Sequence, residues 1–369
     1  MQQLLAKIHT AEVCVACADV SAMIAFFADA LGFRVELVFP ADAPTTAVMS
    51  GFGVRLRFES TIDGAERSTS PATLRLHGDF SGARNAPPIA HTVVAPNGMR
   101  VDLIDDANAL LIPGEPRNRE FVVTRGTDAD WGIGRAGMQY RDLIPSRLGG
   151  RFIASHIRIP EGGPVPDYVH FHKVRFQVIY CKAGWVRVVY EDQGEPFVMR
   201  AGDCVLQPPE IRHRVLEASA GLEVIEIGCP AIHETWADHD LTLPTSALRS
   251  DRSFAGHRFV RHIAANAPWQ PTEIDGMQAR DTGIGVGTDG LARVRVSRPS
   301  ASANAQSMSM RIAEEFHFLF VHVGRVRITL LQHDDQFLDA GDSGVFPGGE
   351  TVLMHCEAGT ELLEVALPG

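Results

Sequence analysis

The sequence predicts a mainly β chain with an α+β module at its N-terminus. From Arg151 onward, strand-like runs alternate with Gly and Pro turns, and no helix-length periodic segment lies among the runs from Arg151 to Gly228. The clear helical period lies near the N-terminus, within VSAMIAFFADALGF. With 369 residues, 45% of them hydrophobic and 21% charged, the chain can build two or three packed domains.

The N-terminal module is predicted over residues 1–106. The apolar strand IHTAEVCVACAD precedes a helix whose apolar residues recur at helical spacing, and Gly32 ends that helix. The runs FRVELVF, TAVMSGF and VRLRFES complete a βαβββ unit. Further strands are expected at TLRLHG, AHTVV and RVDLID, with no second helix of the first kind.

The remainder divides at two polar segments. Residues 107–150, which include RGTDADWGIGRAG, are expected to be a linker that wraps onto its neighbours. Residues 151–236 form a first all-β domain, 237–256 a second linker, and 257–369 a second all-β domain.

The two all-β segments repeat one another. FQVIYCKAGWVRVVY from Phe176 aligns with FHFLFVHVGRVRITL from Phe316, so that Gln177 matches His317. AGDCVLQPPEIRH then aligns with AGDSGVFPGGETV, and GLEVIE with GTELLE, at a nearly constant offset of about 140 residues. The two domains therefore share one fold.

Four polar residues of the first domain are candidate metal ligands. His170 and His172 are two apart in a strand-like run, so their side chains point to the same face. Gln177 lies on the following strand, and His213 follows the turn QPPEIR. Imidazole is the commonest protein ligand for divalent first-row metals, and three imidazoles plus one oxygen donor leave positions open for a substrate.

The run HFHKVRFQVIYCKAGWVRVVY, with AGDCVLQPPEIRH after it, resembles the two motifs of the cupin superfamily. The resemblance covers about 151–228 and, as a degenerate copy, 290–368. It implies two cupin β-barrels and gives His170, His172, Gln177 and His213 the metal-ligand positions. Gln177 departs from the pattern, because many cupins carry a Glu there, and in quercetin-dioxygenase-like cupins that Glu is assigned the role of a base. A neutral ligand set leaves a divalent metal its full +2 charge, which favours an anionic, chelating substrate.

We considered Arg158, Arg175, Arg187 and Arg212 as residues that bind such a substrate, although each is more typical of a solvated surface. In the second copy, the matching positions hold Met310, Ile312 and Val352, none of which is a plausible ligand. The second barrel is therefore expected to bind no metal and to pack against the first.

The N-terminal unit resembles the vicinal oxygen chelate superfamily, which includes glyoxalase, bleomycin-resistance and extradiol dioxygenase proteins. The resemblance rests on IHTAEVCVACADVSAMIAFFADALGF and the late APNGMRVDLID. It puts the family's metal positions near Glu12, Glu59 and Asp102, but Glu12 replaces the usual His. The alternative to a metal site is that this unit serves as a module for dimerisation or for shaping the substrate site.

These features lead to one functional hypothesis with two alternatives. We expect a metal-dependent, dioxygenase-like oxidoreductase that acts on a small chelating organic acid or phenol and holds one divalent ion: Fe, Mn, Ni, Co or Zn. A non-redox isomerase or lyase of sugar acids is the first alternative, and a small-ligand binding protein or sensor is the second. The oxygenase leads because both resembled families include such enzymes, whereas Gln177 favours the non-redox alternative.

Charge and hydropathy bear on partners. The net charge of −11, without a Lys/Arg run, argues against nucleic-acid or anionic-membrane partners. No run of 18 apolar residues and no secretory leader pattern appears, so a cytoplasmic location is expected. A homodimer is expected from the general frequency of symmetric assemblies.

Overall fold

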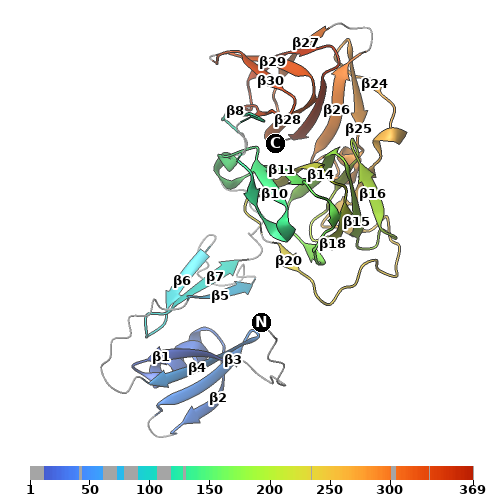
Figure 1. The fold of residues 1–369 in the computed structure, drawn as a ribbon. Coiled ribbons are helices and arrows are strands. Elements are labelled where there is room, and N and C mark those ends of the chain that lie inside the picture. Colours follow the sequence, from blue (N-terminus) through green and yellow to red (C-terminus); the bar gives the residue numbers. More distant parts are fainter. Residues whose placement is uncertain are drawn as a thin grey trace. The chain divides into compact units, whose positions relative to one another are not determined.

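A computed structural model describes residues 12–40, 44–60, 73–78, 90–105, 118–127, 130–233, 235–300, 305–331 and 333–368. The chain divides into two compact units, 1–109 and 110–369. Figure 1 shows both units, coloured along the sequence. No helix in the described part of the chain is long and apolar enough to cross a membrane.

The first unit contains the expected βαβββ order. Its elements are β1 (Val13–Cys17), α1 (Val20–Ala25), a π-helical turn (Phe26–Ala30), β2 (Arg34–Phe39), β3 (Thr46–Gly51), β4 (Val54–Ser60), β5 (Thr73–Gly78), β6 (Ala90–Val94) and β7 (Arg100–Asp105). One sheet has the order β1-β4-β3-β2, with β1 parallel to β4, and the other has the order β5-β7-β6. The side chain of Asp19 caps α1 by accepting from the backbone N–H of Ala22 at 2.9 Å.

Both sheets of the first unit contribute to one hydrophobic core. Met23 and Phe27 from the helical segment are fully buried, as is Phe58 from β4. Val101 from β7 belongs to the same cluster. The secondary structure thus matches the predicted order, and the resemblance to vicinal oxygen chelate proteins stays a prediction.

The second unit begins with a barrel of two sheets. The first sheet contains, in order, β23 (Val260–His262), β17 (Cys204–Leu206), β14 (Phe176–Ala183), β19 (Leu222–Cys229), β11 (Ile153–Ile159), β10 (Gln139–Asp142) and β9 (Gly132–Ile133). The second sheet contains β16 (Phe197–Arg200), β15 (Trp185–Tyr190), β18 (His213–Ala218), β13 (His170–Phe171) and β20 (Trp236–Ala237), with β12 (Gly163–Pro164) paired to β18.

The second barrel repeats this arrangement. One sheet contains β24 (Gln270–Pro271), β25 (Met277–Asp281), β26 (Arg293–Pro299), β33 (Glu361–Leu367), β28 (Phe316–Val323), β31 (Ser343–Val345) and β8 (Val122–Thr124). The other contains β27 (Ala305–Arg311), β32 (Thr351–Glu357), β29 (Arg325–Leu330) and β30 (Gln336–Asp339). The short remaining elements are β21 (Ser253–Phe254), β22 (His257–Arg258), α2 (Ile284–Gly287) and single turns at Arg135–Gly137, Arg147–Gly150 and Ala264–Asn266.

The two barrels follow the repeat seen in the sequence. In the first, Phe176 on β14 lies opposite Cys229 on β19. In the second, Phe316 on β28 lies opposite Leu367 on β33. The turn glycines Gly184 and Gly324 both have positive φ, at 72° and 80°, which a residue with a Cβ rarely adopts. The internal repeat is therefore a repeat of structure.

Each barrel donates one edge strand to the other. β8 precedes the first barrel in sequence but pairs with β31 of the second barrel, and Figure 1 shows β8 next to the labelled strands of that second barrel. β23 precedes the other strands of the second barrel but pairs with β17 of the first. β8, β9 and β10 all lie within 107–150, which was predicted as a linker. Strands of two to four residues are too short to give a periodic signal.

The interface between the barrels is a continuous hydrophobic core. Phe152 of the first barrel stacks on Phe316 of the second, with ring centroids 4.1 Å apart and an interplanar angle of 7°. Both rings are fully buried, in a cluster that also holds Val178 and Val365. This core holds the site-bearing barrel against its partner.

Removing one ring of this stack should destabilise the second unit. Phe316→Ala is expected to lower the free energy of unfolding by about 3–5 kcal/mol, because it deletes a large buried side chain and leaves a cavity. Chemical denaturation measures the change. The control is Phe337→Ala, since that side chain is half exposed and its loss should change stability by less than about 0.5 kcal/mol.

Candidate metal centre

Strand pairing brings the three predicted histidines together. β13 pairs with β18 so that His170 lies directly opposite His213. His172 follows β13 on the same face as His170, and its ring centroid is 5.3 Å from that of His170. The candidate ligand atoms of His170, His172 and His213 all lie within 4.8 Å of one another, and all three residues are buried. The predicted His cluster is thus present.

Backbone hydrogen bonds fix two of the rings in a tautomer suited to metal binding. His170 Nδ1 lies 2.8 Å from the carbonyl oxygen of Tyr168, and His213 Nδ1 lies 2.9 Å from that of Ile211. A carbonyl only accepts, so each Nδ1 carries the hydrogen and each Nε2 keeps its lone pair. Ligating histidines in metal sites are oriented by hydrogen bonds of this kind.

The same two rings are held neutral. Burial lowers the pKa of His170 to about 4, and the nearby guanidinium of Arg135 acts in the same direction. Burial also holds the pKa of His213 well below its ordinary value, with His170 and His172 adding to the effect. Neutral imidazole is the form that coordinates a metal, so the donor set fits a divalent ion.

Gln177 lies at the same centre. Its side chain, from β14, lines one chamber together with His170, His172 and His213. Its Nε2 donates to Oε1 of Glu226 on β19 at 2.5 Å. Sequence reasoning missed Glu226, although Leu222, Val224 and Glu226 alternate along β19 and all line the chamber. A carboxylate in the inward-facing series of a strand is a signal that could have found it.

A cation also reaches the histidines. Arg135 Nη2 lies 3.1 Å from His170 Nε2, and Arg135 Nη1 forms an ion pair with Asp167. The fully buried Asp167 carboxylate also accepts from the backbone N–H of Val215 at 2.9 Å. Arg135 lies in the segment predicted as a linker, and for that reason the sequence did not nominate it.

The arginines nominated from the sequence lie elsewhere. Arg158 stacks over the Trp131 ring, and Arg175 pairs with Glu315. Arg187 and Arg212 form ion pairs with acidic residues, and none of the four lines the chamber. The expected solvated surface position holds for Arg187, which is exposed, whereas Arg158, Arg175 and Arg212 are half-buried.

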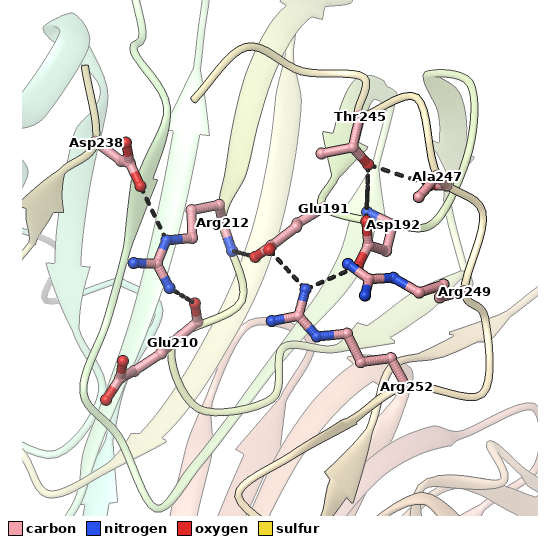
Figure 2. A network of polar contacts seen from close by, with 9 residues as sticks. All are labelled: Glu191, Asp192, Glu210, Arg212, Asp238, Thr245, Ala247, Arg249 and Arg252. Atoms are coloured by element: carbon pink, nitrogen blue, oxygen red, sulfur yellow. Dashed lines mark hydrogen bonds and ion pairs between the residues drawn. The ribbon is translucent and has the colours of Figure 1, made fainter. Parts of the chain in front are cut away.

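A polar network ties the segment 237–252 to the first barrel, as Figure 2 shows. Arg212, next to His213, donates to Asp238 at 3.0 Å. Further along the segment, Arg249 and Arg252 pair with the buried carboxylate of Asp192. β20 at the start of this segment also pairs with β13. This segment therefore supports the strands that carry His170 and His213, through the pairing of β20 with β13 and the contact of Asp238 with Arg212.

The histidines face a small, mostly aliphatic chamber of about 90 Å³. Its apolar walls come from Met138, Ile157, Ile159, Ile179, Val186, Val188, Met199, Val215, Leu222 and Val224. For comparison, a cavity of about 150 Å³ holds benzene. Tyr190 stacks on His213 and accepts from Gln207 Nε2 at 3.0 Å, which adds one polar point to the wall.

A wider cleft of about 480 Å³ adjoins the chamber. Arg135, Tyr140, His172 and Glu226 line both spaces. His233 also lines the cleft, and its ring centroid is 5.4 Å from that of His172. A ligand that enters the cleft can therefore reach the three histidines by passing His172 and Glu226, which line both spaces.

The second barrel has different side chains at the matching positions. Met310 lies opposite Val352 across β27 and β32, as His170 lies opposite His213 in the first barrel. Ile312 is fully buried in the second barrel's core. Within the described ranges, the metal-type cluster of His, Cys, Asp or Glu is the one formed by the three histidines of the first barrel.

The acidic residues nominated in the first unit have partners of their own. Glu12 lies 2.7 Å from Arg55, and Glu59 lies 2.7 Å from Arg57. Asp102 accepts from Thr92 at 2.8 Å. These carboxylates do not gather into a cluster of possible metal ligands among the described residues.

Comparison with known proteins gives the fold. No family model matches the chain, and no curated protein matches it. Among solved structures, the protein Ylba of E. coli aligns with a TM-score of 0.50 and 12% identity, over 71% of this chain and 94% of that one. The paired barrels have a cupin fold.

Two oxalate decarboxylase structures also align with the chain. A single-residue mutant of the Bacillus subtilis protein aligns at 15% identity with a TM-score of 0.49, over 70% of this chain and 81% of that one. The formate complex of the Lactobacillus farciminis protein aligns at 13% identity with a TM-score of 0.49, over 70% of this chain and 88% of that one.

Replacing a histidine of the first cupin barrel should remove bound metal. Purified protein is expected to carry about one transition-metal ion per chain, and His170→Ala and His213→Ala should each lose most of it, because each removes an imidazole donor. Elemental analysis after desalting measures the content. His239→Ala, which removes an exposed histidine, is the control; retention of metal in both site variants would refute the ligand assignment.

Proposed function

We propose that the first cupin barrel is the active site of a metal-dependent enzyme acting on a small, anionic, chelating organic acid. One observation carries this proposal: three buried histidines converge at the wall of a chamber into which a fixed arginine also reaches. His170, His172 and His213 would hold the metal, together with Gln177. When bound, a divalent ion would supply Lewis-acid chemistry at its open positions.

The charges at the site support an anionic substrate. The three imidazoles and the Gln177 amide are neutral donors, so they do not reduce the charge of a divalent ion. Arg135 adds a guanidinium whose position is fixed by the buried Asp167 carboxylate. Such a guanidinium can donate two N–H groups to a carboxylate, which orients the acid beside the histidines.

The chamber narrows the choice among substrates. Its volume of about 90 Å³ is smaller than the cavity of about 150 Å³ that holds benzene, which favours a small substrate over a phenol. Its lining is largely aliphatic, which favours an apolar chain over the several hydroxyl groups of a sugar acid. A short organic acid with an apolar chain fits both properties.

Within this class, we favour a dioxygenase-like oxidoreductase, as the sequence suggested. An isomerase or lyase of sugar acids is the alternative, and a binding protein or sensor without turnover is a second. The expectations of a homodimer, a cytoplasmic location and no nucleic-acid or membrane partner remain predictions from the sequence.

A substrate screen with and without oxygen tests the reaction class. Metal-loaded protein is incubated with short hydroxy- and keto-acids, phenols and sugar acids, while an oxygen electrode and mass spectrometry follow the reaction. Oxygen consumption coupled to product formation is the expected result for short acids. Product without oxygen consumption would select the isomerase or lyase, and ligand-induced thermal shifts without product would select the binding protein.

Loss of the fixed arginine should weaken binding of acids without removing the metal. Arg135→Ala is expected to reduce the affinity of metal-loaded protein for propionate by about 10–100-fold, because it removes charge-assisted hydrogen bonds. Calorimetric titration measures this affinity, and elemental analysis measures the metal. Arg187→Ala, which removes an arginine outside the chamber, is the matched control; equal propionate affinity in the two variants would contradict the role of Arg135.

A further inference from the structure

The contact between Gln177 and Glu226 occupies the nitrogen end of the Gln177 amide. We propose that Glu226 is a positioning residue: its carboxylate binds the amide nitrogen of Gln177 and thereby presents the amide oxygen as a metal ligand. This inference rests on the proposed metal site in the first barrel.

The first step is the chemistry of the contact. The Gln177 amide atom 2.5 Å from Glu226 Oε1 is Nε2. An ionised carboxylate has no hydrogen to donate, so the amide group that faces it has to be the NH₂ end. The oxygen is then at the other end of the planar amide. Among the described residues, Oε1 of Gln177 makes no hydrogen bond with the protein, and the side chain lines the chamber of the histidines.

The second step is the strand geometry. Gln177 on β14 lies opposite Gly228 on β19, and Ile179 lies opposite Glu226. Gln177 and Glu226 are therefore diagonal neighbours on one face of an antiparallel pair, within reach of long side chains. Glu226 is fixed by a central strand of the sheet and does not depend on a loop.

The third step is the comparison with the second barrel. There, Glu364 matches Glu226 and His317 matches Gln177. Glu364 accepts from Arg295 at 3.0 Å and from the hydroxyl of Ser297. In the first barrel, the residue opposite Glu226 on β11 is Ser155, where the second barrel has Arg295 opposite Glu364. No arginine competes for Glu226 among the described residues, so its carboxylate is free to hold Gln177.

The arrangement explains why an amide serves at position 177. A glutamate there would put two carboxylates at the 2.5 Å contact, which is strongly unfavourable. With glutamine at position 177, the ligand itself is neutral. The negative charge then belongs to Glu226, which contacts the amide of Gln177 and not the metal. Partners in this outer layer typically change metal affinity by about 10–100-fold when they are replaced.

The test is the affinity of the full chain for Co²⁺, measured by calorimetric titration after chelator treatment. Glu226→Leu should weaken Co²⁺ binding by about 10–100-fold. Glu226→Gln should weaken it less, because an amide oxygen can still accept from Gln177. Glu223→Gln alters the same strand on its other face, where Glu223 binds Lys182 and His156, and should leave the affinity unchanged.

A double-mutant cycle separates positioning from a general structural effect. If Glu226 acts through Gln177, Glu226→Leu should cause no further loss in a Gln177→Ala background. The reversed pair, Gln177→Glu with Glu226→Gln, restores one carboxylate and one amide at the contact. It should bind Co²⁺ at least about tenfold more tightly than Gln177→Glu alone.

The outcomes distinguish this inference from the proposed function. If the wild-type protein binds no Co²⁺, the metal site itself fails. If it binds Co²⁺ but Glu226→Leu binds equally well, or costs as much affinity in the Gln177→Ala background as in the wild type, the positioning role is refuted while the metal site stands. Should Glu226→Leu not fold, the two Gln177→Glu variants decide, and equal affinities would overturn the inference.

Discussion

The antiparallel pairing of β13 with β18 is the constraint on which the site depends. β13 has only two residues, yet it puts His170 directly opposite His213. A strand this short is weak alone, and neighbouring contacts hold it in place. β20 pairs with its other edge, and Asp167 accepts a hydrogen bond from Val215 on β18. The register of the β13–β18 pair therefore decides whether the imidazoles of His170 and His213 lie close enough to bind one metal ion.

The two barrels have similar backbones but different side chains in their interiors. The strands that the two barrels share have the same order, and both barrels place a pair of residues opposite each other where the first has His170 and His213. In the second barrel those residues are Met310 and Val352, and the interior is packed with apolar side chains. The backbone therefore permits a metal centre without requiring one, since side chains alone supply the donors.

Charge in the first barrel is arranged in layers. The candidate ligands His170 and His213 are held neutral. The carboxylates Glu226 and Asp167 lie behind Gln177 and beside His170. Asp167 holds the Arg135 guanidinium next to the same ring. Glu226 lines both the chamber and the adjoining cleft, as Arg135 does, so a carboxylate and a guanidinium both face these spaces.

The sequence by itself determined the strand-rich fold, the repeat and the histidines of the centre. Alternation of side chains along a strand is local, so the spacing of His170 and His172 already puts them on one face. Only the tertiary structure decided which distant residues join them. Arg135 comes from short strands and turns that give no periodic signal, and Glu226 becomes significant only when β14 and β19 pair. The exchange of β8 and β23 between barrels was likewise beyond the sequence, because pairing of such short edges depends on three-dimensional packing and not on local pattern.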